Sequence, residues 1–194
     1  VVNSTALDEL KFTKETPDPP GGVIHRDSEG VPNGILSESA FMGPLFFNSP
    51  SIYSKIMAAY DTEAKAQMMI RCAETYHRLG IVGAHDPFVD AMTLKTYQEV
   101  DHAGRFPFRM YAYILNSWAD PLVAAGINRG FGSDYVKIGA IKMFLDGGMS
   151  SRTAAVFEPY ASAGGGTGIL NYDQDGVNHE VEKFDRAGYQ ISVH

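Results

Sequence analysis

Residues 135–148, YVKIGAIKMFLDGG, contain a run, residues 138–145, that is apolar apart from Lys142 and is followed by Asp146 and two glycines. Branched and aromatic residues favour a β-strand, and we expect this strand over residues 138–145. Side chains alternate between the faces of a strand, so Lys142 and Asp146 share one face, and the opposite, wholly apolar face is expected to meet helices. A buried ammonium is so costly that such a lysine usually loses its proton or finds a counter-charge.

Outward from this strand, helical and strand patterns alternate about every 30 residues, which is typical of βαβ units around a parallel sheet. Residues 61–80 predict a helix that begins at Asp61 or Thr62, carries apolar residues at helical spacing and ends at Gly80. The other predicted helices are residues 92–104, 120–128 and 176–188, and the other predicted strands are residues 81–86, 108–115 and 189–194.

Four strands with three helical crossovers predict an α/β fold that is part of a (β/α)8 TIM barrel. A complete barrel needs about 250 residues, whereas this chain has 194. Barrel enzymes keep their active sites at the C-terminal ends of the strands. Lys142 and Asp146 fall at this rim, His194 ends the last strand on an inward position, and His85 ends the strand that begins with IVGA.

The first sixty residues follow a different pattern. Residues 16–40, TPDPPGGVIHRDSEGVPNGILSESA, alternate turn residues with two short β-like runs and predict a β-hairpin inserted ahead of the repeating units. Residues 41–57 are apolar, aromatic and broken by two prolines, so they could line a pocket or cover the barrel rim. We therefore divide the chain into an insertion with a pocket-lining segment, residues 1–60, and a partial barrel catalytic domain, residues 61–194.

The composition excludes several classes of protein. The net charge of −7 and the absence of a Lys/Arg cluster argue against a nucleic-acid partner. No apolar run approaches the roughly 20 residues of a membrane helix, and no signal peptide is recognisable. The single cysteine, Cys72, fits packing in a helix and a reducing compartment, so we expect a cytoplasmic protein. Because the chain opens without Met in sequence that already reads as folded, we expect a fragment.

Taken together, these motifs resemble the amidohydrolase superfamily, and specifically amidohydrolase family 3. The resemblance covers nearly the whole chain and rests on VNSTAL, TPDPPGGVIHRDSEGVPNGIL, LGIVGAHD and IKMFLDGGMSSRTAAVFEPY followed by GYQISVH. In that family the lysine that matches Lys142 lies on the fourth barrel strand, and the histidine that matches His194 ends the fifth. The resemblance therefore implies that this chain holds about strands 2 to 5 of the barrel.

The resemblance also implies a function, a metal-dependent hydrolase that cleaves carbon–nitrogen bonds of amides, cyclic amides or N-acyl compounds with a metal-activated water. It makes Lys142, carbamylated by carbon dioxide, and His194 the catalytic residues and the ligands of one or two divalent metal ions, with zinc expected. An unmodified Lys142 paired with Asp146 is equally open. Asp146, His85 and Arg152 are candidates to support the ligands or touch the substrate, and each also has a purely structural interpretation.

The departures from the family limit what the chain can do alone. The family's His-x-His of the first strand would precede Val1, and its histidine of the sixth strand and aspartate of the eighth would follow His194. Zinc needs about four ligands, so this stretch alone is expected to be inactive. The alternative function is a barrel-derived binding or structural protein without the metal site. The expected partner is a small amide-like substrate; a homo-oligomer is open, and neither nucleic acid nor a membrane is expected.

Overall fold

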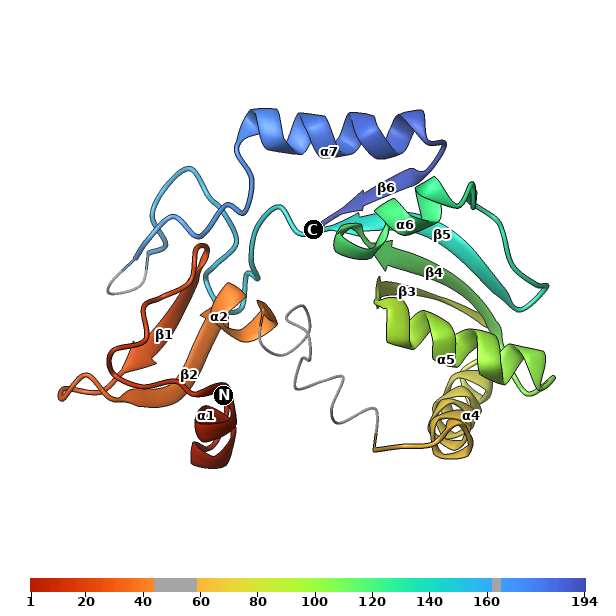
Figure 1. Cartoon of the computed structure of the whole chain (residues 1–194), viewed down its shortest axis with the longest axis horizontal. Coiled ribbons are helices and arrows are strands. Elements are labelled where there is room, and N and C mark those ends of the chain that lie inside the picture. The colour runs from red at the N-terminus through yellow and green to blue at the C-terminus, as the bar shows by residue number, and fades with distance from the viewer. Residues whose placement is uncertain (44–58, 162–164) are drawn as a thin grey trace. The chain divides into compact units, whose positions relative to one another are not determined.

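The computed structural model describes residues 1–43, 59–161 and 165–194 (Figure 1). It divides into two compact units, one of Val1–Met57 with Asp146–Asn171 and one of Ala58–Leu145 with Tyr172–His194. Residues 146–171, which follow the central strand in sequence, thus group with the N-terminal residues. The predicted division into residues 1–60 and 61–194 stays a prediction, and most of the predicted pocket-lining stretch, residues 41–57, lies outside the described residues.

The larger unit is built on a four-stranded sheet in the order β3-β4-β5-β6. All three neighbouring pairs are parallel. The predicted set of adjacent, parallel strands is therefore confirmed, and the chain has an α/β fold. The strands are β3 (Gly83–Val89), β4 (Arg109–Leu115), β5 (Val136–Met143) and β6 (Gln190–Val193).

Helices connect these strands as the sequence predicts. They are α4 (Thr62–Arg78), α5 (Ala91–His102), α6 (Asp120–Ala124) and α7 (Gln174–Arg186), with a short 3-10 turn, η2 (Asn116–Trp118), before α6. Three of them begin directly after an extended aspartate whose side chain accepts a hydrogen bond from a backbone N–H three residues on, at Asp61, Asp90 and Asp173. Such caps satisfy N–H groups that a helix start leaves unpaired. Within the described ranges, every helix falls short of the length and apolarity needed to cross a bilayer.

The apolar core lies on one face of the sheet. Ala112 and Ile114 of β4 and Ile138 and Ile141 of β5 pack there with Phe184 of α7, and all of them are buried. A second cluster at the amino ends of the strands joins α4 and α5 to the sheet through Ala66, Ala73, Val100, Phe106, Phe108, Met110 and Val136. The helices therefore cover this face, and the opposite face of the sheet is available for polar residues.

A β-bulge in β5 alters the predicted alternation of side chains. Ala112 of β4 pairs with Ile138, but Ile114 pairs with Ile141, so β5 holds one extra residue between these pairs. Both isoleucines face the core. Gly139 lies between them, where a Cβ would approach the ring of Tyr111 to 2.5 Å, so only glycine fits there. Bulges re-aim side chains and are common beside active sites. Lys142 lies beyond the bulge, where the predicted alternation holds.

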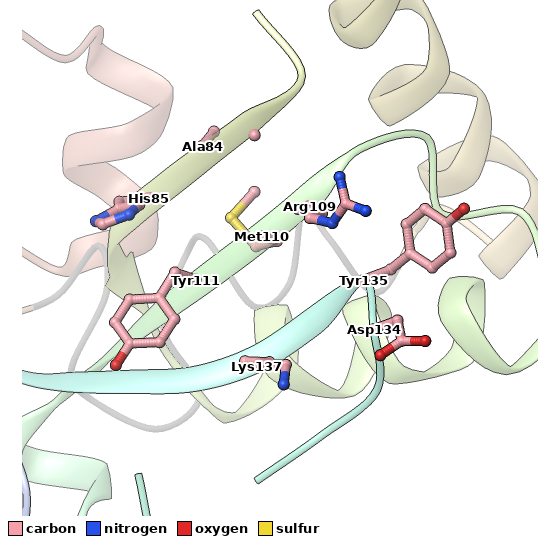
Figure 2. A pocket seen from close by; sticks show the side chains of 9 residues that line it. Ala84, His85, Arg109, Met110, Tyr111, Asp134, Tyr135 and Lys137 are labelled. Carbon is pink, nitrogen blue, oxygen red and sulfur yellow. The ribbon is translucent and has the colours of Figure 1, made fainter. Parts of the chain in front are cut away.

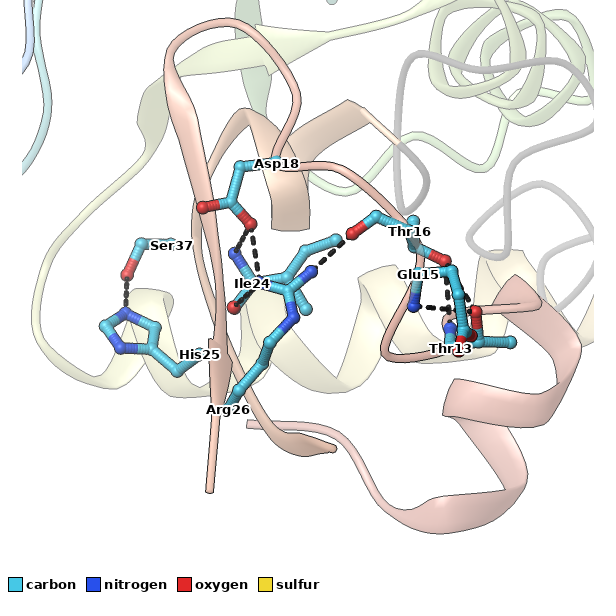
Figure 3. Close-up of polar contacts among 8 residues, drawn as sticks. All are labelled: Thr13, Glu15, Thr16, Asp18, Ile24, His25, Arg26 and Ser37. Carbon is cyan, nitrogen blue, oxygen red and sulfur yellow. Dashed lines mark hydrogen bonds and ion pairs between the residues drawn. The ribbon is translucent and has the colours of Figure 1, made fainter. Parts of the chain in front are cut away.

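The smaller unit contains the predicted hairpin, which is confirmed as the antiparallel pair β1 (Gly22–Arg26) and β2 (Pro32–Glu38). It also contains two helices that the sequence pattern did not indicate, α1 (Ser4–Leu10) and α2 (Ser39–Met42). Figure 3 shows how the proline-rich loop before β1 is held: Asp18 Oδ1 accepts from Ile24 N at 3.0 Å and from Arg26 Nη1 at 2.9 Å. His25 Nε2 lies 2.9 Å from Ser37 Oγ across the two strands, as a hydrogen bond within the hairpin.

Candidate functional site

Lys142 is a buried lysine near the C-terminal end of β5. It lies between Leu115 of β4 and Ser192 of β6 in the sheet register, on the face opposite the apolar core, and is only 6% exposed. Burial lowers its pKa below the usual range for lysine, because the apolar surroundings disfavour the charged form. Among the described residues no ion pair to Lys142 is present; instead its Nζ stands 4.7 Å from the centre of the Phe144 ring.

His194 lies beside the same aromatic ring. Its backbone continues the parallel pairing beyond β6, with His194 N donating to Met143 O at 2.9 Å and Leu145 N donating to His194 O at 3.3 Å. The His194 and Phe144 rings are 5.5 Å apart at an interplanar angle of 33°. The structure thus brings the side chains of Lys142 and His194 to one face of the sheet, where both contact Phe144.

Phe144, which alternation along the strand puts on the Lys142 face, has a role in this group that the sequence pattern did not indicate. Besides Lys142 and His194 it meets Phe88 of β3, with ring centres 5.8 Å apart at 62°. Its position two residues after Lys142 puts it on the same face by simple alternation, so the signal was present in the sequence. The aromatic pair supplies an apolar surround that disfavours charge on Lys142. The catalytic and ligand roles of Lys142 and His194 stay predictions.

Asp146 and Arg152 belong to the loop of the smaller unit. The Asp146 carboxylate accepts a hydrogen bond from Ala155 N at 2.9 Å, and the Asp146 backbone forms an isolated bridge with Leu170. Arg152 has a left-handed backbone with φ of 58°, and its N–H donates to Met149 O at 3.1 Å, while its side chain is exposed. Asp146 therefore fixes the course of this loop, and the functional roles predicted for Asp146 and Arg152 stay predictions.

His85 does not end its strand, so its predicted position at the rim is wrong. It is the third residue of β3, which continues to Val89, and it lies in register with Tyr111. Lys142 is in register with Leu115, four residues further along β4, or roughly 13 Å at the usual rise of a strand. His85 Nδ1 lies 2.7 Å from the hydroxyl of Tyr113. This hydrogen bond and the flanking tyrosine rings favour a structural role.

A pocket of about 780 Å³ lies at the amino-terminal ends of the strands (Figure 2). His85, Arg109, Tyr111 and Lys137 line it together with Gly83, Ala84, Met110, Asp134 and Tyr135. It lies at the end of the sheet opposite Lys142 and His194. The pocket is therefore distinct from the predicted site.

The described residues do not by themselves complete a metal site. Within these ranges there is no group of three or more His, Cys, Asp or Glu side chains that could hold a metal ion. His194 offers an imidazole nitrogen, and Lys142 offers donors only as a neutral amine or a carbamate. Zinc takes about four ligands. The donor types of Lys142 and His194 therefore suit a metal ion, but these two residues are too few to hold one.

Comparison with known proteins identifies a family. The sequence model for amidohydrolase family 3, described as an amidohydrolase family, matches residues 1–194. YtcJ of Bacillus subtilis (strain 168) is 25% identical over 202 residues, which cover 100% of this chain and 35% of YtcJ. The N-substituted formamide deformylase of Arthrobacter pascens is 33% identical over 108 residues, which cover 56% of this chain and 19% of the deformylase.

A solved structure has the same fold over the whole chain. It is an uncharacterized metal-dependent hydrolase from Pyrococcus furiosus, with a TM-score of 0.66 and 23% identity, and the match covers 100% of this chain and 37% of that protein. The parallel sheet and the hairpin therefore correspond to part of a larger hydrolase fold. The chain spans about a third of the length of YtcJ and of the Pyrococcus protein.

Proposed function

The chain belongs to the amidohydrolase family, and from this premise we propose that it is part of a metal-dependent hydrolase that cleaves carbon–nitrogen bonds of amides, cyclic amides or N-acyl compounds. The observation that carries the proposal is the meeting of Lys142 and His194 on the ring of Phe144, where adjacent parallel strands end. Without a chemical role, a buried lysine beside a histidine would only reduce the stability of the fold, because removing its charge from water costs free energy. The deformylase among the relatives has a name that fits this substrate class.

The fold that we propose for the whole protein is a (β/α)8 barrel in which β3 to β6 are strands 2 to 5. Two observations support it: the four strands are parallel and consecutive in the sheet, and helices cover one of its faces. In such a barrel the face that carries Lys142 is the interior, and His194 and Lys142 lie toward the C-terminal rim where catalytic residues gather. The remaining strands, and the remaining metal ligands, belong to parts of the protein outside these residues.

In the proposed reaction, Lys142 and His194 supply two of the metal ligands. Burial favours the neutral amine of Lys142, and only the neutral amine forms a bond to the carbon of carbon dioxide, with loss of one proton to water. The resulting carbamate presents two oxygen donors, and His194 presents a ring nitrogen. The packed rings of Phe144 and Phe88 would exclude water from one side of the Lys142 and His194 side chains. A divalent metal, which we expect to be zinc, would be held by these donors together with ligands from elsewhere in the protein, and would lower the pKa of a water and polarise the substrate carbonyl.

The test uses the full-length protein and a small amide substrate such as an N-substituted formamide. Chelation should abolish hydrolysis, and zinc should restore it. Lys142→Ala should lower kcat by more than about 100-fold, and a short carboxylic acid should restore part of the loss, because its oxygens replace those of the carbamate. His194→Asn should weaken metal binding with little effect on folding.

Lys137→Ala is the matched control, because Lys137 lies on the same strand and the same face but is exposed and before the bulge. It should retain both metal and activity. A Lys142→Ala protein with undiminished metal content and turnover would disprove the proposed site. A full-length protein that binds no divalent metal would favour the alternative of a binding or structural protein.

A further inference from the structure

A polar network joins Glu38, the last residue of β2, to the loop that follows β5. The hydroxyl of Thr153 donates to the Glu38 carboxylate, although the two residues are 115 positions apart. The same hydroxyl oxygen accepts from Gly148 N at 3.0 Å and lies 2.7 Å from Ser151 Oγ. Thr153 is only 9% exposed. The Glu38 carboxylate therefore fixes the Thr153 hydroxyl, and the loop after β5 forms its hydrogen bonds around that hydroxyl.

The glycine pair of the loop fits around this contact. A Cβ on Gly147 would lie 2.6 Å from Glu38 Oε1 and would collide with the Thr153 hydroxyl. Real Cβ atoms do not approach oxygens so closely, so any side chain at position 147 would displace either Glu38 or Thr153. The first glycine of the DGG sequence is therefore required first by Thr153, whose side chain lies nearest, and then by Glu38, a residue that the sequence pattern gave no reason to connect with it.

Glu38 combines this contact with an unfavourable backbone conformation. Its φ of 48° and ψ of −120° lie in a region that suits glycine and not a residue with a Cβ. Such a conformation costs about 1–3 kcal/mol and persists where the side chain or the surroundings require it. Glycine at this position would relieve the strain, so the carboxylate is the part of Glu38 that the structure needs.

We propose that Glu38 is a positioning residue for the hydrolytic reaction. Through the hydroxyl of Thr153, its carboxylate fixes the loop of residues 147–153, which leaves the strand that carries Lys142. Loops at the C-terminal ends of parallel strands contact substrates in α/β enzymes, and a displacement of about 1 Å in a positioning element can cost about 100-fold in rate. The inference rests on the proposed function, because the loop follows the Lys142 strand in the chain and Glu38 would act on the same reaction.

The test compares three substitutions of Glu38 in the full-length, metal-loaded protein. Glu38→Gln keeps an acceptor oxygen of the same reach and should keep kcat within about threefold, whereas Glu38→Ala should lower kcat at least about 10-fold with little change in KM or metal content. Glu38→Gly should lose kcat as Glu38→Ala does, yet unfold at a higher temperature than Glu38→Ala, because glycine accepts the left-handed backbone.

Substitutions of Thr153 provide the matched partner. Thr153→Val removes the hydroxyl at nearly constant volume and should lower kcat as Glu38→Ala does, whereas Thr153→Ser should retain most of it. Because both residues act through one contact, the double variant Glu38→Ala with Thr153→Val should lose no more activity than either single variant. Hydrogen exchange of the amides of residues 147–153 should accelerate in both single variants and stay slow in Glu38→Gln.

Several results would overturn the inference. A Glu38→Gly protein with full kcat would show that the contact serves only folding, and additive losses in the double variant would show that the two residues act separately. A wild-type protein without metal and without amide hydrolysis would instead refute the proposed function, and with it any role of Glu38 in that reaction. Hydrogen exchange then still tests whether Glu38 fixes the loop. Unchanged exchange of the amides of residues 147–153 in Glu38→Ala would reject that claim, and accelerated exchange would support it.

Discussion

At the scale of single residues, the chain places one basic side chain in surroundings that do not favour its charge. Lys142 is buried, its pKa is lowered by burial, and the described residues provide it with an aromatic ring in place of a carboxylate. The face of an aromatic ring attracts an ammonium group by only about 0.5–2 kcal/mol. This compensates only part of the cost of removing a charge from water. We therefore expect Lys142 to weaken folding.

This cost predicts that removal of the amine stabilises the protein. In the metal-free full-length protein, Lys142→Met should raise the free energy of unfolding by about 1–3 kcal/mol, because the thioether fills similar space without the desolvation cost. Urea unfolding monitored by circular dichroism measures the change. Lys137→Met, at an exposed position of the same strand, should change stability by less than about 0.5 kcal/mol. A loss of stability in Lys142→Met would mean that another part of the protein provides a counter-charge.

At the scale of elements, ion pairs and caps fix where the helices begin and how they join. Glu63, in the first turn of α4, binds Arg105 after α5 through two hydrogen bonds, one of them 3.1 Å long between Arg105 Nη2 and Glu63 Oε1. Gln67 donates to the same carboxylate at 3.0 Å. The hydrogen bond from Arg105, followed by the one from Gln67, lowers the pKa of Glu63 from 4.5 to about 2. The contact ties two helices that cover the sheet.

The lowered pKa predicts a pH dependence of stability. A carboxylate whose pKa is lower in the folded state stabilises the fold above its unfolded pKa, and this contribution is lost as the pH falls from about 4.5 to about 2. Glu63→Gln should therefore destabilise the protein slightly at pH 7, less at pH 3, and hardly at all below pH 2, since the pair is exposed and screened by salt. Glu74→Gln, at an exposed position of the same helix, is the control and should show no such trend. Urea midpoints at several pH values measure both.

At the scale of the whole molecule, the sheet ends in two strands that pair on one side only among the described residues, β3 and β6. Unpaired edges offer backbone N–H and C=O groups to any other strand. Near the edge strand β3, Leu79, Ile81 and Val82 are exposed by 73%, 41% and 64%. In the proposed barrel, neighbouring strands would cover both edges.

This arrangement predicts how residues 1–194 behave when expressed alone. They should associate, eluting in size exclusion at more than twice their 21.2 kDa mass, or should bind a hydrophobic dye such as ANS as a loosely packed state. The full-length protein under the same conditions is the control and should bind little dye. A monomer of these residues that unfolds cooperatively without binding the dye would argue against the proposed barrel.

Much of the fold could be predicted from the sequence, because its causes are local. The helices and strands follow hydrophobic periodicity, the start of α4 follows the capping aspartate Asp61, and the hairpin of β1 and β2 follows its turn residues. Alternation along β5 and β6 also brought Lys142 and His194 to one face of the sheet, since it depends only on strand geometry.

Other features depend on contacts between residues far apart, which no local pattern contains. The continuation of β3 to Val89, which moves His85 away from the rim, follows from pairing with β4. The absence of room for a side chain at Gly139 follows from the approach of Tyr111 on the neighbouring strand. The link from Glu38 to Thr153 crosses 115 positions and overrides the backbone preference of Glu38 itself. Local sequence thus specifies which elements form and which side chains alternate. Where the strands end and which distant groups meet depends on tertiary packing, because hydrogen-bond pairing and close packing are satisfied by the whole fold together.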